Sequence, residues 1–74
     1  MMPLSFLKGG DTCIVIKVNG TPEVRKHLED LGFTEGARVQ VVSAPGKGNL
    51  IVSCRETRRA VTADMARRIL NKEI

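Results

Sequence analysis

The sequence has no tryptophan and no tyrosine, and Phe6 and Phe33 are its only aromatic residues. It therefore lacks the rings on which proteins usually stack the bases of single-stranded nucleic acids. The formal net charge of +4 would suit an anionic partner, but the basic residues are dispersed along the chain. We therefore read the charge as ordinary solubilising charge and expect no nucleic-acid partner. A small basic barrel that binds nucleic acid is kept only as an alternative.

The sequence also lacks clustered cysteines, a long apolar run and the opening of a signal peptide. Its two cysteines, Cys13 and Cys54, are far apart, whereas metal motifs place their ligands in closely spaced pairs. No segment approaches the length needed to cross a bilayer. These absences predict a cytoplasmic protein whose two thiols are reduced and pack like small apolar side chains on neighbouring strands.

The chain has 74 residues, which predicts a single domain with a core over about residues 4–70. A domain of this size buries only about 60% of the surface that its unfolded chain exposes, so a deep substrate pocket is not expected. No nucleophile, base and acid stand at a recognisable spacing, and the only histidine is His27. The sequence therefore predicts a protein that is not an enzyme.

Apolar periodicity divides the chain into strands and two helices. The residues before position 8 form one short turn that docks Leu4 and Leu7 on the domain. In the first strand we expect Ile14, Ile16 and Val18 to face the core, with Cys13 and Val15 on a second, partly covered face. Residues 44–49 have turn chemistry throughout. Strands are expected at residues 12–18, 38–43, 50–54 and 58–61, and helices at 22–31 and 63–70, the last with a buried stripe of Met65, Ala66 and Ile69.

The first helix carries clear signals at both ends. Thr21 is suited to accept a hydrogen bond from a free backbone N–H, and Pro22 fits the first helical position. Val24, Leu28 and Leu31 form one apolar stripe, and Gly32 is the expected left-handed stop. Together with the strands, this predicts a mostly β fold with short helices: a small SH3-like, partly open barrel with an inserted helix and a short C-terminal helix.

Several stretches resemble one known family over about residues 4–70. Residues 4–10 read Leu-Ser-Phe-Leu-Lys-Gly-Gly, and from residue 25 a basic and apolar helix ends in Leu31-Gly32 and is followed by Phe-Thr-Glu-Gly. A strand with an Ala44-Pro45 corner follows. The combination resembles the ferrous iron transport protein A family (FeoA). Four residues depart from the family pattern: Gly9 and Glu35, where proline is usual, Glu56, where glycine is usual, and Arg59, where an apolar residue is common.

The resemblance implies an SH3-like accessory protein of bacterial ferrous iron uptake. It further implies docking on the cytosolic GTP-binding part of the membrane iron transporter. For that partner we expect contacts from Lys26, Glu29, Phe33 and Pro45, with Phe33 either in the core or partly exposed as an anchor. An exposed strand edge near Arg58 could also pair with a second copy.

The main alternative is a metal sensor or carrier, because the implied fold is similar to the SH3-like domain of iron-dependent repressors. Glu23 and His27 stand one helical turn apart and could offer two ligands to Fe²⁺ or another divalent transition metal. A firm site needs three or four protein ligands, so neither a metal site nor a cofactor is expected to be firm. We expect these two side chains to be exposed polar residues.

Overall fold

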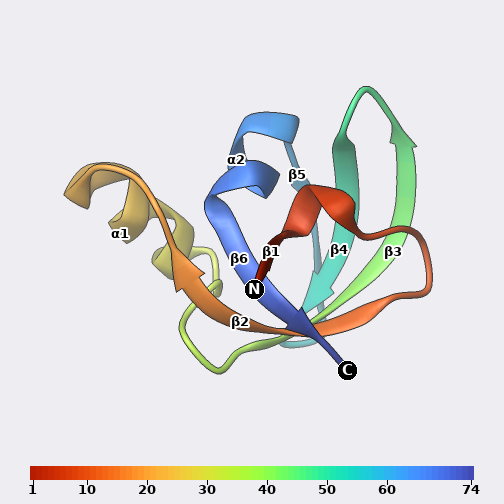
Figure 1. Ribbon diagram of the computed structural model, residues 1–74, viewed down its shortest axis with the longest axis horizontal. Coiled ribbons are helices and arrows are strands. Elements are labelled where there is room, and N and C mark those ends of the chain that lie inside the picture. Colours follow the sequence, from red (N-terminus) through yellow and green to blue (C-terminus); the bar gives the residue numbers. More distant parts are fainter.

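The computed structural model describes residues 1–74 as one six-stranded antiparallel sheet, curled into a partly open barrel (Figure 1). The strand order is β1-β6-β2-β3-β4-β5, so β1 and β5 form the two edges, and the expected edge near Arg58 is confirmed. The mostly β fold with two short helices is also confirmed. The elements are β1 (Met2–Pro3), η1 (Leu4–Phe6), β2 (Thr12–Val18), α1 (Pro22–Asp30), β3 (Arg38–Gly46), β4 (Asn49–Cys54), β5 (Thr57–Val61), α2 (Ala63–Arg68) and β6 (Ile69–Glu73).

Helix α1 begins and ends as its sequence signals predict. The Thr21 hydroxyl accepts a hydrogen bond from the Val24 amide at 3.3 Å, and Pro22 occupies the first turn. Leu31 is the C-cap, and Gly32 follows with a φ of +108°, a conformation that favours glycine. The helix is therefore fixed at both ends by local chemistry.

The predicted core face of β2 is wrong for Ile14 and Ile16. Cys13 and Val15 are buried, whereas Ile14 and Ile16 are only half-buried and lie on the opposite, outer face. The register with β6 shifts between Val15 and Lys17, which marks a bulge at the position between them. A bulge moves the following residues to the other face, so Val18 packs against the core with Cys13 and Val15. Every residue of β2 except the lysine is apolar or β-branched, so alternation alone could not identify the inner face.

The end of the chain also differs from the prediction. Helix α2 ends at Arg68, and Ile69, expected on its buried stripe, instead begins β6, which lies in the sheet between β1 and β2. Asn71 in the middle of this strand is fully buried, and its side-chain Nδ2 donates to the Met2 carbonyl oxygen at 3.0 Å. Asparagine is depleted in strands, so local propensity does not predict a strand here.

The β3–β4 hairpin is longer and tighter than predicted. Ala44 and Pro45, expected in a turn, lie in β3, and the turn itself consists of Lys47 and Gly48, both with positive φ. Two central residues with positive φ match the hairpin turns whose twist fits that of the strands. A Cβ on Gly48 would lie 2.9 Å from the Cβ of Ala63, so the hairpin packs closely against the start of α2.

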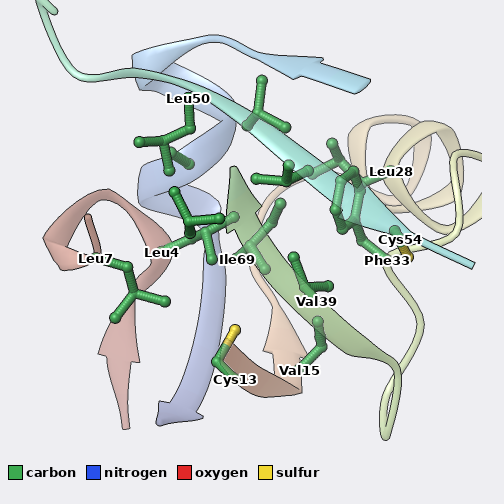
Figure 2. Close-up of a cluster of buried hydrophobic side chains, with 14 residues drawn as sticks. Leu4, Leu7, Cys13, Val15, Leu28, Phe33, Val39, Leu50, Cys54 and Ile69 are labelled. Carbon is green, nitrogen blue, oxygen red and sulfur yellow. The ribbon is translucent and has the colours of Figure 1, made fainter. Parts of the chain in front are cut away.

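One core of fourteen buried apolar residues fills the barrel (Figure 2). Its largest side chain is that of Phe33, which lies beside Leu28 of α1 and Cys54 of β4. The predicted docking of η1 is confirmed, because Leu4 and Leu7 are buried. The other members are Cys13, Val15, Val39, Val41, Leu50, Val52, Val61, Ala66 and Ile69.

The β4–β5 turn holds two non-glycine residues in left-handed conformations. Arg55 has a φ of 53° and Glu56 a φ of 65°. A side chain with a Cβ pays about 1–2 kcal/mol for this conformation, which glycine adopts without that cost. The turn is thus a point of backbone strain in this chain.

We expect Glu56→Gly to raise the free energy of unfolding by about 1 kcal/mol, because it removes the Cβ from a left-handed position. Urea unfolding should show a higher midpoint with an unchanged m-value. Glu56→Ala is the control, since it removes the charge and keeps the Cβ. If both variants gained the same stability, the gain would come from the loss of the Glu56 charge. The inferred backbone strain would then be contradicted.

Candidate functional site

Helix α1 presents an almost entirely charged surface at the side of the sheet (Figure 1). Only Leu28 is fully buried, and Val24 is half-buried beneath the helix. None of its charged side chains forms an ion pair, because the two ion pairs of the molecule join Asp64 to Arg67 and Arg68. Its exposed ionisable residues are Glu23, Arg25, Lys26, His27, Glu29 and Asp30.

An open groove of about 230 Å³ runs between α1 and the end of β2. Arg25 and Glu29 border it from the helix and Lys17 from the strand, and Glu35 adds a second carboxylate. Two positive and two negative charges around a shallow groove do not concentrate charge of one sign. The arrangement suits a polar protein surface better than a small ion, because opposite charges can pair across an interface and set its register.

The α1 side of the molecule is held by contacts at the corner after the helix. The Phe33 amide donates to the Leu28 carbonyl at 3.0 Å, which satisfies a carbonyl at the helix end. The Cys54 thiol donates to the Gly32 carbonyl at 3.3 Å. An added Cβ at Gly32 would also lie 3.3 Å from the Cys54 sulfur, so this corner sits directly on β4.

The structure separates the four predicted contact residues. Lys26 and Glu29 are exposed on α1, and Glu29 borders the groove. Phe33 is fully buried, so its side chain holds the helix to the core and is not an exposed anchor. Pro45 is exposed on the β3–β4 hairpin, at the opposite side of the molecule from α1 (Figure 1). A single surface therefore includes Lys26 and Glu29 but not Pro45.

Phe6 was not predicted as a surface residue. It is 74% exposed, although it belongs to the turn η1 that docks on the barrel. The sequence held a signal for this, because Leu4 and Leu7 are three residues apart and share the buried side of the turn. Phe6 lies between them in the sequence and points away from the core.

Glu23 and His27 stand alone as potential metal ligands. Both are exposed on α1, one helical turn apart. Nowhere in the chain do three or more His, Cys, Asp or Glu side chains come together in a way that could hold a metal ion. Two ligands on a solvated helix surface leave most of the coordination sphere to water, which gives a weak site.

The two cysteines pack in the core on either side of one residue. Cys13 in β2 and Cys54 in β4 both pair with Val39 of β3, so they lie on alternate rather than neighbouring strands. Two strand spacings amount to about 10 Å, which is too far for a disulfide. Burial, and after it the charges of Glu73 and Asp11, raises the pKa of the Cys13 thiol to about 11. A thiol with this pKa stays protonated near neutral pH and is a poor nucleophile.

The curled antiparallel sheet with its short helices is the fold of a small SH3-like domain. The profile of the FeoA domain family matches residues 2–72, and the chain belongs to the FeoA family. FeoA is a family of accessory proteins in ferrous iron transport. Neither helix is long and apolar enough to span a membrane. No curated protein sequence matches the chain.

Solved structures of FeoA proteins superimpose over almost the whole chain. A crystal structure of an iron uptake regulatory protein (FeoA) is 32% identical, with a TM-score of 0.90 over 99% of this chain and 96% of its own. The Chlorobium tepidum FeoA protein is also 32% identical, with a TM-score of 0.87 over 99% of this chain and 70% of its own.

Two further structures carry metal in their descriptions. The Stenotrophomonas maltophilia FeoA was solved with zinc and is described as a prokaryotic SH3-domain protein and candidate ferrous iron transport activating factor. It is 27% identical, with a TM-score of 0.82 over 97% of this chain and 91% of its own. A manganese-dependent transcriptional repressor, 17% identical with a TM-score of 0.88 over 99% of this chain and 41% of its own, shares the fold alone.

The raised pKa of Cys13 predicts a loss of stability in alkaline solution. Its thiol has an ordinary pKa of 9.0 in the unfolded chain and a pKa of about 11 in the native protein. Between these values the unfolded chain has lost the proton that the native protein keeps. The free energy of unfolding should therefore fall as pH rises through this window, by up to about 1.4 kcal/mol per pH unit.

Urea unfolding at a series of pH values measures this slope. Cys13→Ala is the control, since it removes the thiol and keeps all other titrating groups. The variant should show a shallower decline across the same window. An identical slope in both proteins would show that the Cys13 thiol does not contribute.

Proposed function

We propose that this protein is a non-enzymatic accessory protein of ferrous iron uptake that acts in the cytoplasm by docking on the GTP-binding part of the membrane iron transporter. Membership of the FeoA family over residues 2–72 is the observation that carries this proposal. The description of the Stenotrophomonas maltophilia protein as a candidate transport activating factor supports a protein partner. Binding to that transporter goes beyond these two observations and is what we propose.

The surface we propose for docking is the outer side of α1 with the groove that borders β2. Lys26 and Glu29 are three residues apart, both exposed and both free of ion pairs, so each is available to a partner. The helix stands at the side of the sheet and reaches it through Leu28 and the Phe33 corner. Docking there would leave the barrel undisturbed.

Three structural features support the non-enzymatic part of this proposal. The Cys13 thiol is buried and its pKa is raised, so it does not supply a nucleophile at neutral pH. His27, the only histidine, is exposed on α1 and takes part in no side-chain hydrogen bond. The hollows of the domain are open and shallow, which suits contact with another macromolecule more than enclosure of a substrate.

A titration against the isolated cytosolic GTP-binding domain of the transporter tests docking, with the partner nucleotide-free and bound to GDP or a GTP analogue. A combined Lys26→Glu and Glu29→Lys variant exchanges the two charges and keeps the net charge constant. It should weaken binding about tenfold or more, because both charges would then face like charges on the partner. The matched control exchanges Lys47→Glu with Glu73→Lys, both exposed and outside α1.

The control exchange should bind like the unmodified protein. Absence of binding in every nucleotide state would overturn the proposed partner. If both exchanges weakened binding equally, the proposed partner would still be supported, but the contact surface would not be the outer side of α1.

Metal binding is a second candidate function, favoured by the zinc in the Stenotrophomonas maltophilia structure. In this chain the candidate ligands are Glu23 and His27 alone, so Zn²⁺ and Fe²⁺ should bind weakly and without fixed stoichiometry. Calorimetric titration of the reduced protein under anaerobic conditions measures this. Tight stoichiometric binding that is lost in His27→Ala would contradict it and make a metal sensor or carrier the better assignment.

A further inference from the structure

The outer face of the sheet carries a row of polar side chains across four strands. Thr12 in β2 lies opposite Gln40 in β3, Gln40 lies opposite Ser53 in β4, and Ser53 lies opposite Arg58 in β5. Residues directly opposite in an antiparallel sheet point to the same side. Their neighbours Val39, Val41, Val52 and Cys54 are buried, so this row faces away from the core.

A second row on the same face adds two more cations. Ile14 lies opposite both Arg38 in β3 and Lys72 in β6, and Arg38 is two residues from Gln40. Arg38, Arg58 and Lys72 are exposed, and none of them belongs to an ion pair. Three cations therefore lie on this face, and none of them is held in an ion pair.

An open hollow of about 360 Å³ lies on this face beside Arg38. Arg38 and Arg55 border it together with the Gln40 amide and the Ser53 hydroxyl. Arg55 is held in place, because its left-handed backbone fixes the turn and its Nη2 donates to the Thr34 hydroxyl oxygen at 3.3 Å. A guanidinium held in this way loses little freedom on binding and can offer its remaining N–H groups to a planar carboxylate.

Three observations select the chemistry of the ligand. Glu56 also borders the hollow, and its negative charge repels a phosphate dianion more strongly than it repels a single carboxylate. Ile14 and Ile51 are half-buried on the same face, so they offer apolar area that a protein segment can cover and a free oxyanion cannot. No aromatic side chain lies on this face, so nucleotide bases have nothing to stack on.

We propose that this surface, which we name the basic sheet face (Arg38, Gln40, Ser53 and Arg55), binds an acidic segment of a partner protein. Arg38 and Arg55 bind Asp or Glu carboxylates, Gln40 and Ser53 donate hydrogen bonds, and the neighbouring isoleucines contact the apolar stems of the segment. The proposal is independent of docking through α1, since it uses β3, β4 and the β4–β5 turn and names no transporter.

Chemical-shift mapping of the whole protein with poly-L-glutamate as the probe tests the basic sheet face. Backbone shifts should cluster at Arg38, Gln40 and Ser53 and should weaken with added salt, because exposed charges are screened. The combined Arg38→Glu and Arg55→Glu variant should bind about tenfold more weakly or worse. Arg38→Glu alone is the second variant, since it leaves the β4–β5 turn intact if the double change impairs folding.

The control variant changes the net charge equally elsewhere, through Lys8→Glu and Lys47→Glu, two exposed lysines outside the basic sheet face. The control variant should bind poly-L-glutamate nearly tenfold more tightly than the combined Arg38→Glu and Arg55→Glu variant. An equal loss in the control would reduce the effect to net charge and overturn the site. Tighter binding of inorganic phosphate or a single-stranded oligonucleotide than of poly-L-glutamate would overturn the assigned ligand.

Discussion

The placement of α1 depends on the burial of one aromatic ring. Phe33 follows the helix stop directly and fills the space between Leu28 and β4, with no exposed surface. In a domain this small the net stability is only a few kcal/mol, and removing a buried phenyl ring costs about 3–5 kcal/mol. The charged outer side of α1 can thus be held for a partner because its inner side is fixed by this ring and by the Cys54 contact with Gly32.

The sequence was most informative where local chemistry decides the structure. The Thr21 cap, Pro22 and Gly32 fix the limits of α1 almost to the residue, since each acts through its own backbone or side chain. The sheet depends instead on pairing between distant segments. Pairing with β3 and β6 turns Cys13 and Val15 inward, the bulge after Val15 brings Val18 to the same side, and the buried Asn71 lies in a central strand, so none of these could be predicted from local propensity.

The candidate sites show the same contrast between features set by local sequence and features set by the pairing of distant strands. Lys26 and Glu29 were predicted correctly as exposed, because helical periodicity places them outside the apolar stripe of Val24, Leu28 and Leu31. Pro45 was grouped with them only on the basis of its turn chemistry, and the fold carries it to the other side of the molecule. The basic sheet face escaped prediction altogether, since Arg38 and Arg55 are far apart in the sequence and meet through the register of β3 with β4.

The position of β6 affects how the protein can fold. The hairpins β3–β4 and β4–β5 join segments that are close in the sequence, so they can form early with little loss of chain entropy. The central strand β6 must instead pair with β2 and β1, and the contact between Asn71 and Met2 spans nearly the whole chain. Closing so long a loop is slow, and until it closes the inner edge of β2 remains open to pairing with other chains. Protection of nascent chains from aggregation therefore depends on how quickly the last strand reaches the middle of the sheet.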